Sequence, residues 1–382
     1  MIIHPLTPTV ENGEIRIAAR IEPEKPPYDL PPTLWFKFPE AHASFVSARA
    51  DGLALALLFI ALQRGEDLRV RGTLSPRLAF GMNEYQRIET LRNPQKYHPI
   101  GICADQYAPA ESPGDKIAAP FSGGVDSFYT VWTHIPQNEK YSGNALTHAI
   151  FVQGFDIGLQ DTRSFEICTH AYRVMLREWN VELLTASTNV RAFDRHTNWS
   201  ANYKPALMGL AHLLGRGLRQ FYIPAEYSYD ESEMGIASAL QFALLSSESL
   251  AILNDGSRLS KFERILAIAN VPATYNTLRV CYVRPTGLMN CGECGKCVNT
   301  MTALEIAGTL QHYTTFPQPL TRQRIRSARA SYAALTLYLS TLRGARAHHR
   351  YDLALDMSIM LLRNSLHWGT KYIQRKLSHP EP

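Results

Sequence analysis

Short segments near the start of the chain alternate apolar and polar residues with a period of two, which is typical of β-strands with one buried face. They cover residues 14–22, 33–38 and 67–72. Between them the apolar run LALALLFIAL predicts a buried helix over residues 51–64, because this run is only about half as long as a membrane span. An amphipathic pattern predicts another helix over residues 75–92. We therefore expect residues 1–115 to form a small α+β module.

The pattern changes after a loop rich in turn formers at residues 108–115. From there, short apolar strands alternate with helical segments. The expected strands are 116–121, 146–154, 181–188 and 220–226, and the expected helices are 128–135, 162–179 and 204–217. This alternation predicts an α/β fold with a doubly wound parallel sheet, in a domain that covers residues 116–310.

The C-terminal region, residues 311–382, is predicted to be helical and basic. Apolar residues recur there at three- and four-residue spacing over 330–344 and 354–366. From Arg322 to the end, eleven Lys or Arg stand against three acids, an excess larger than the net charge of +5 for the whole chain. Such a surface binds nucleic acid or an acidic partner, or it is simply a solvated helical face.

The composition adds broad constraints. The 382 residues are 45% hydrophobic and 19% charged, which is typical of globular proteins, and the length favours two domains. The first residues lack a charged segment followed by an apolar run, so no signal peptide is expected. We expect a soluble, cytoplasmic protein without a membrane partner.

The segment with the clearest chemistry is the turn SGGVDS between the strand at 116–121 and the following helix. Glycines let the backbone bend sharply, and the N–H groups at a helix start bind anions. Parallel sheets bind ligands at this carboxyl edge. The lysine of a Walker-type P-loop is absent, which argues against a kinase-type site. The alternative is an ordinary Ser-Gly-Gly loop.

The string SGGVDS resembles the PP-loop signature of the N-type ATP pyrophosphatases, whose fold is of the adenine nucleotide alpha hydrolase type. These enzymes cleave ATP to AMP and pyrophosphate and leave AMP on an oxygen of the substrate. The resemblance implies that ATP and Mg²⁺ bind here and that Asp126 organises metal or phosphate. The residues expected to hold ATP in the turn are Ser122, Gly123, Gly124, Val125, Asp126 and Ser127.

The same resemblance extends to two other segments. Lys261 in SKFERI is expected to reach the phosphates of ATP and, with Ser122 and Asp126, to act in catalysis. Otherwise, Lys261 is an ordinary surface residue before a helix. Phe151 and Gln153, at the end of the second strand, are expected to border the adenosine. Arg258 is a candidate for a second cation.

Four of the six cysteines lie close together in the sequence, with the spacing C-x9-C-x2-C-x2-C. Thiols clustered in this way are typical of a structural Zn²⁺ site with four thiolates and no open position. The ligands are Cys281, Cys291, Cys294 and Cys297. An iron–sulfur cluster and a redox-active CxxC motif are the alternatives.

The segment CYVRPTGLMNCGECGKC resembles the zinc loop of the 7-cyano-7-deazaguanine synthases, the QueC family. Together with SGGVDS and Lys261, the resemblance covers about residues 117–310. It implies that ATP adenylates a carboxylate, such as 7-carboxy-7-deazaguanine, and that an amine then displaces AMP to give an amide or nitrile. Extended members of this family resemble proteins of bacterial anti-phage operons. In those proteins the acceptor is expected to be an amine of a partner protein instead of ammonia, and the N-terminal module would contact that partner.

Two substrate loops depart from the family pattern. Gln153-Gly154-Phe155-Asp156 stands in place of an Asp-Tyr-Gly-Gln motif, and residues 200–205 stand in place of a Pro-Gly-Arg-Asn motif. The identity of the activated carboxylate therefore stays open. The candidate substrate-binding residues are Asp156, Lys204 and Glu226, followed by Asn198 and Asp230, and each of them also suits a cap or loop. His196, beside Trp199, suits either stacking or a solvated loop.

Two other functions remain open. Other PP-loop enzymes thiolate a tRNA base or add lysine to it, and the basic C-terminal region would suit RNA. Thiolation needs a further reactive cysteine, and only Cys103 and Cys168 remain outside the cluster. The third hypothesis is a nucleotide-binding scaffold that has lost turnover and acts as a subunit of a complex.

Overall fold

The computed structural model describes residues 1–109, 113–195, 197, 199–231, 233–281, 283 and 286–378. The chain divides into two compact units, each made of several segments. Unit 1 contains Met1–Ser122, Thr130–Pro224 and Ala237–Asp255, and unit 2 contains Gly123–Tyr129, Ala225–Ile236 and Gly256–Pro382. The boundary expected near residue 115 therefore falls inside unit 1.

Unit 1 is built on one sheet of eleven strands, counted over the described residues. Neighbouring strands follow the order β11-β10-β7-β8-β9-β4-β3-β1-β5-β6, and β2 pairs with β3. The strands are β1 Ile2–Pro5, β2 Thr9–Glu11, β3 Glu14–Glu22, β4 Thr33–Pro39, β5 Leu68–Leu74, β6 Ile102–Tyr107, β7 Lys116–Pro120, β8 His148–Gln153, β9 Glu182–Thr188, β10 Leu218–Pro224 and β11 Ala251–Asp255. Six of the ten strand pairings are parallel, so the predicted α/β class with a mostly parallel sheet is confirmed.

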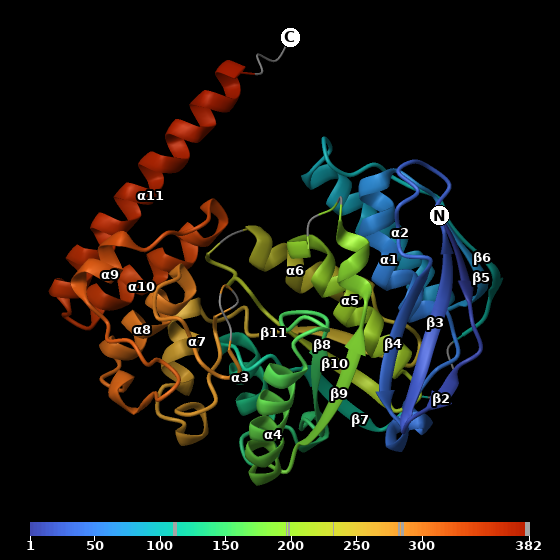
Figure 1. The fold of residues 1–382 in the computed structure, drawn as a ribbon, viewed down its shortest axis with the longest axis horizontal. Helices are drawn as coiled ribbons and strands as arrows, with labels where there is room; N and C mark the ends of the chain where they lie inside the picture. The colour runs from blue at the N-terminus through green and yellow to red at the C-terminus, as the bar shows by residue number, and fades with distance from the viewer. Residues whose placement is uncertain are drawn as a thin grey trace. The chain divides into compact units, whose positions relative to one another are not determined.

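Strands from the N-terminal region continue the same sheet instead of forming a sheet of their own. Strand β4 pairs antiparallel with β9, with Phe36 opposite Thr188 (Figure 1). The Thr188 hydroxyl also donates to the Trp35 carbonyl at 2.7 Å, which ties the two strands together at one end. The alternating pattern predicted the strands at 14–22 and 33–38, but it carries no information about which strand lies beside them.

The helices of unit 1 pack on this sheet and on one another. Those that lie wholly in unit 1 are α1 Asp51–Arg64, α2 Pro76–Arg92, α4 Thr162–Glu178 and α5 Trp199–Leu213, with the 3-10 helices η1 Glu40–Phe45, η2 Ser142–Asn144 and η3 Val190–Asp194. Helices α3 Val125–His134 and α6 Glu233–Leu244 begin in unit 2 and end in unit 1.

Helix α1, from the N-terminal region, crosses α5 at close range. A Cβ atom on Gly209 would lie 2.5 Å from the Gly52 carbonyl oxygen, so only glycine fits at the crossing. Helix α1, which the sequence predicts to be buried, therefore packs against α5, a helix from the middle of the chain. Residues 1–122 and 130–224 consequently share one hydrophobic core.

Several elements differ from the sequence-based expectation. Helix α5 begins at Trp199, five residues before the predicted start at 204, so Pro205 lies inside it. The pattern did not predict β6, β11 or α6. Strands β6 and β11 are short and carry polar residues on half of their length, so they lack the apolar signal of a buried strand.

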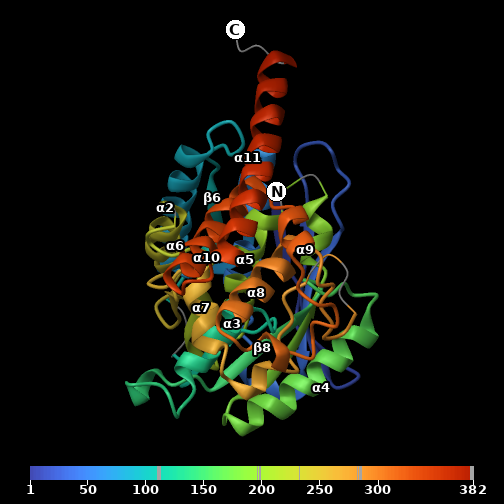
Figure 2. The same ribbon diagram turned by 90° about the vertical axis from the view of Figure 1, so that its left-hand side faces the viewer.

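Unit 2 consists mainly of helices that pack around the cysteine-bearing segment (Figure 2). They are α7 Lys261–Ile268, α8 Gly295–Ile306, α9 Arg322–Ser327, α10 Leu335–Ala347 and α11 Tyr351–Ser378, with the 3-10 helices η4 Pro272–Thr274, η5 Leu310–His312 and η6 Tyr332–Ala334. Within the basic C-terminal region, Arg322 and Arg326 both pair with the buried Asp356, at 3.0 and 2.6 Å. Among the described residues, no helix combines the length and apolar character that a membrane span needs.

Candidate functional site

The glycine turn lies between β7 and α3, where the sequence predicts it. Gly123 has a φ of +75°, a left-handed conformation that favours glycine. Helix α3 begins at Val125, three residues earlier than expected, so Asp126 and Ser127 lie in its first turn. The Ser127 hydroxyl donates a hydrogen bond to the Gly124 carbonyl at 3.0 Å, which stabilises the turn. The turn therefore leads directly into the N-terminus of helix α3.

Asp126 is the centre of an ion cluster inside unit 2. Its two carboxylate oxygens accept hydrogen bonds from Lys261 Nζ at 2.6 Å and from Arg264 Nη1 at 2.5 Å. The Arg264 side chain is fully buried. It also donates to the carbonyls of Ala225 and Glu226, which fixes the loop that follows β10. The structure therefore brings the predicted pair Asp126 and Lys261 together, and it adds an arginine that sequence reasoning missed.

Local sequence explains where Lys261 lies. Ser260 caps helix α7, and Glu263 completes a capping box by accepting from the Ser260 backbone N–H at 2.8 Å. Glu231 accepts from the Lys261 backbone N–H at 3.1 Å. Lys261 is consequently held at the first position of the helix, and its side chain is directed at Asp126.

The charges of this cluster shift the pKa values of both partners. Burial would raise the pKa of Asp126, but the Lys261 and Arg264 cations outweigh burial and lower it. Burial lowers the pKa of Lys261, and the attraction of Asp126 offsets only part of this effect. At neutral pH Asp126 is a carboxylate that holds its cations in fixed positions.

Arg279 adds a second buried arginine to unit 2. Its backbone N–H donates to the Gly123 carbonyl at 2.8 Å, which places the residue directly on the glycine turn. Its side chain is 3% exposed, and within the described residues its Nε and Nη2 atoms have no hydrogen-bond partner. Leaving two nitrogens of a buried guanidinium unpaired is costly unless an anion binds them. The only sequence signal was an arginine within the otherwise apolar segment LRVCYV.

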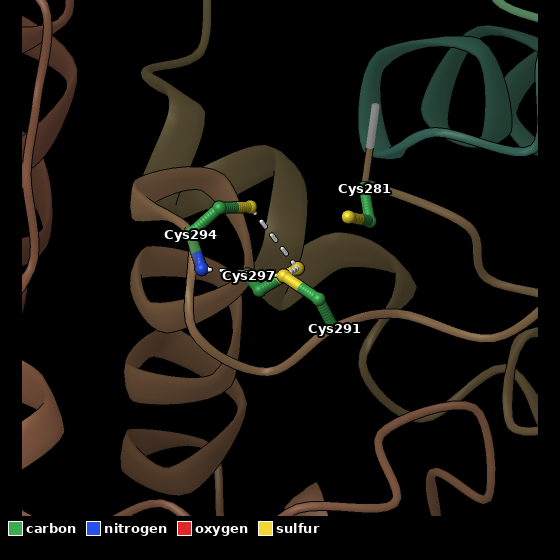
Figure 3. Close-up of side chains that lie close together, drawn as sticks. All are labelled: Cys281, Cys291, Cys294 and Cys297. Carbon is green, nitrogen blue, oxygen red and sulfur yellow. Dashed lines mark hydrogen bonds between the residues drawn. The ribbon is translucent and has the colours of Figure 1, made fainter. Parts of the chain in front are cut away.

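The four predicted cysteines converge in unit 2, and their sulfur atoms all lie within 4.8 Å of one another (Figure 3). The Cys291 and Cys297 sulfurs are 3.8 Å apart, and those of Cys294 and Cys297 are 3.4 Å apart. Zn–S bonds of about 2.3 Å place the sulfurs of a tetrahedral site about 3.8 Å apart. The four thiols therefore fit one Zn²⁺ ion. Four sulfur ligands leave no open position for catalysis.

Hydrogen bonds to Asn290 organise the backbone around the cysteines. The Asn290 side-chain oxygen accepts from the N–H groups of Val280 at 2.8 Å and Cys281 at 3.0 Å, which joins the two ends of the loop. Cys294 precedes helix α8, and its hydrogen bond with Cys297 lowers the pKa of Cys294 and raises the pKa of Cys297. A thiolate is the form that binds zinc.

The cysteine loop also contributes a cationic side chain whose charge acts on the ion cluster. Lys296 lies between two of the predicted ligands, and its charge acts on both Asp126 and Lys261. Among the described residues, unit 2 therefore has three cationic side chains that act on Asp126 and a fourth cationic residue whose backbone contacts the glycine turn. The three are Lys261, Arg264 and Lys296, and the fourth is Arg279.

The predicted residues of unit 1 have other local roles. The Ser122 carbonyl accepts a hydrogen bond from the Tyr172 hydroxyl at 3.4 Å. Phe151 is buried and stacks on Phe165, with ring centroids 4.8 Å apart. The Gln153 side-chain amide donates to the carbonyls of Gly158 and Leu159, at 3.3 and 3.1 Å, and so braces the loop after β8.

The predicted substrate residues are divided between the two units. In unit 1, Asp156 is exposed, and the Lys204 ammonium lies 5.1 Å from the centre of the Phe242 ring. In unit 2, Glu226 is half-buried, whereas Asp230 and Arg258 are exposed. His196 and Asn198 lie outside the described residues.

Comparison of the chain with protein-family models, with curated proteins and with solved structures finds no match. The function therefore has to be inferred from the ion cluster, the glycine turn and the four thiols themselves.

Proposed function

We propose that this protein is a PP-loop ATP pyrophosphatase that activates a carboxylate by adenylation. The observation that carries the proposal is Arg279, whose backbone N–H donates to the Gly123 carbonyl of the glycine turn and whose buried guanidinium has Nε and Nη2 unpaired within the described residues. Lys261, Arg264 and Lys296 add positive charge in the same unit. Such a cluster suits a polyphosphate, because fixed cations stabilise the charge that develops on the leaving pyrophosphate.

The strand order of unit 1 supports the doubly wound interpretation. In the parallel part of the sheet, β8 and then β9 follow β7 on one side. On the other side of β7, the next strands are β10 and then β11. The order reverses between β7 and β10, and ligands in such sheets bind near the reversal, at the carboxyl ends of the strands. The glycine turn directly follows β7.

The first chemical step transfers AMP. A carboxylate oxygen of the substrate attacks the α-phosphorus of ATP, the bond from that phosphorus to the bridging oxygen breaks, and pyrophosphate leaves with the electron pair. Backbone N–H groups of the turn and the cations Lys261 and Arg279 would bind the departing pyrophosphate. Catalysis here is mainly positioning and charge stabilisation.

Mg²⁺ accompanies ATP in the family that the turn resembles. Both Asp126 oxygens are engaged, one by Lys261 and one by Arg264. Asp126 therefore does not fit as a Mg²⁺ ligand in this arrangement. Its role in the proposal is to hold two cations in place.

The second step forms the product. An amine nitrogen attacks the acyl carbon of the adenylate, AMP leaves with the electron pair, and the nitrogen loses a proton. The resemblance of the cysteine loop to the QueC family favours 7-carboxy-7-deazaguanine as the carboxylate, and ammonia or a protein amine as the acceptor. The zinc ion would have a structural role, since it fixes the segment that carries Arg279 and Lys296.

The test is to incubate the protein with ATP, Mg²⁺ and 7-carboxy-7-deazaguanine and to measure AMP and pyrophosphate. We expect equal amounts of both, formed only with the carboxylate. Lys261→Ala should lower the rate at least about 100-fold, the typical cost of losing one charge-stabilising group. Lys140→Ala, at an exposed lysine, should leave the rate unchanged.

Other outcomes would favour the other functions. AMP release that depends on RNA would indicate a tRNA-modifying enzyme. ATP binding without AMP release would indicate a scaffold. Release of ADP and phosphate would contradict the proposed chemistry outright.

A further inference from the structure

Unit 1 contains a second group of metal-ligating side chains, made of His42, His148 and Glu182. His42 lies in η1, whereas His148 and Glu182 are the first residues of the neighbouring parallel strands β8 and β9 and face each other in register. One ligand atom of each side chain lies within 4.8 Å of the others. These residues lie at the amino ends of the strands, whereas Ser122 follows the carboxyl end of β7.

Hydrogen bonding fixes the tautomer of His148. The Thr147 hydroxyl donates its single hydrogen to the Ile117 carbonyl at 2.8 Å. Its contact with His148 Nδ1 at 2.9 Å must therefore be donated by the ring. The tautomer with its N–H on Nδ1 has its lone pair on Nε2, which is the atom available to a metal ion.

This lone pair faces a carboxylate. His148 Nε2 lies 3.4 Å from Glu182 Oε2, which is longer than a strong hydrogen bond. A metal-binding histidine typically donates its other ring N–H in this way, which orients the ring and its lone pair.

His42 completes the group from the opposite side. Its Nε2 lies 2.8 Å from Glu182 Oε1, and its side chain is only 11% exposed. Its Nδ1 atom is buried and has no partner among the described residues. The Phe45 ring packs edge-on against both histidines, with centroids 5.5 and 5.3 Å away, and restricts their movement.

We propose that His42, His148 and Glu182 bind a divalent transition-metal ion of the zinc class. Two imidazoles and one carboxylate form a ligand set that zinc prefers. Bonds of about 2.0–2.1 Å in a tetrahedral site separate nitrogen and oxygen ligands by about 3.3 Å, close to the 3.4 Å at His148. The nearby Lys116 opposes a cation, but it pairs with Asp115 at 3.0 Å.

The ion has a structural consequence within unit 1. It joins η1, from the N-terminal region, to the first residues of β8 and β9. Glu182 is 58% exposed, so this ligand can be reached from solvent. Such a site is independent of the four-cysteine cluster, which uses only thiolates, and of the ATP chemistry proposed above.

The test measures the total zinc that the full-length protein binds, of which the four-cysteine site accounts for one equivalent. We expect two equivalents in the wild type. Glu182→Gln and His42→Gln should each bind one, with the affinity for the second ion lowered by more than about 100-fold, because losing an outer-sphere partner alone costs 10- to 100-fold. His4→Gln is the matched control, since His4 also pairs with a glutamate, at 3.1 Å, but has no second histidine in the described metal-ligating groups. It should bind two equivalents.

Cobalt distinguishes the two sites independently. Co²⁺ at the four-cysteine site gives intense thiolate charge-transfer absorption, whereas the second equivalent should add only weak d–d bands, and Glu182→Gln should lose only those bands. Circular dichroism without added metal checks that each variant is folded. A wild type that binds one equivalent, or a second equivalent that persists in both folded variants, would overturn the proposal.

Discussion

Replacing Arg279 with methionine should make the unliganded protein more stable and its affinity for ATP lower. Stability and binding should move in opposite directions because the guanidinium is buried while Nε and Nη2 lack partners within the described residues. If Arg279 had a purely structural role, its replacement would make the protein less stable. Methionine suits the position because it is unbranched and apolar, and its backbone N–H keeps the hydrogen bond to Gly123.

The magnitudes follow from the two unpaired nitrogen atoms. Each buried donor group without a partner costs about 1–3 kcal/mol. Local relaxation recovers part of this cost, so the free energy of unfolding should rise by about 1–3 kcal/mol in the variant. With ATP bound, each charge-assisted hydrogen bond contributes about 1.5–3 kcal/mol. Losing two of them should weaken ATP binding by at least about 3 kcal/mol, which is roughly 100-fold in Kd.

The assay combines urea unfolding of the unliganded protein with calorimetric titration of ATP. Arg343→Met, at an exposed position on α10, is the control for the same chemical change and should alter neither quantity. If Arg279→Met destabilises the unliganded protein, or leaves the Kd for ATP unchanged, the guanidinium does not bind a phosphate of ATP and this reasoning is refuted.

Three further changes test other parts of the structure. Cys291→Ser removes one thiol of the cluster and should lower the zinc content by one equivalent in elemental analysis, together with the melting temperature. Gly209→Ala places a Cβ 2.5 Å from the Gly52 carbonyl and should cost about 1–3 kcal/mol in urea unfolding. Burial lowers the pKa of His134, but the hydrogen bonds and negative charges of Asp255 and Glu139 together outweigh burial and raise it above 6.5. The stability that His134 adds over His134→Gln should therefore be complete below pH 6.5 and decline as the pH rises through the folded pKa.

Each of these predictions has a control and an outcome that contradicts it. Cys103→Ser lies outside the cluster and should keep the full zinc content, so equal zinc loss in both variants would count against the site. Gly143→Ala meets no atom within 4 Å, and a cost equal to that of Gly209→Ala would show that the helix crossing is not tight. A difference between wild type and His134→Gln that stays constant from acidic to alkaline pH would contradict the assigned charge pairing.

Local sequence predicted the features that depend on local spacing. The four cysteines lie close together because turns and a helix start within a short segment bring them there, and their grouping is confirmed. The strand before the glycine turn and the helix after it follow from apolar periodicity, although α3 begins earlier than expected. The capping box at Ser260 and Glu263 could also have been predicted from the sequence, since it has a fixed three-residue spacing.

Contacts between distant segments could not be predicted in this way. Arg264 resembles any basic residue on a helix until the fold brings it to Asp126 and buries it completely. His148 and Glu182 become neighbours only through the register of β8 and β9, and His42 joins them from another part of the chain. The pairing of β4 with β9 likewise depends on burial over the whole unit, which no single segment reveals.

The most direct test of the proposed adenylation follows an oxygen atom. The substrate 7-carboxy-7-deazaguanine is prepared with ¹⁸O in its carboxylate and turned over with ordinary ATP, Mg²⁺ and ammonia, and the released AMP is examined by mass spectrometry. Because the carboxylate oxygen attacks the α-phosphorus and leaves with AMP, we expect one ¹⁸O atom in the phosphate of each AMP formed. AMP without ¹⁸O, formed at the same rate as product, would contradict an acyl-adenylate.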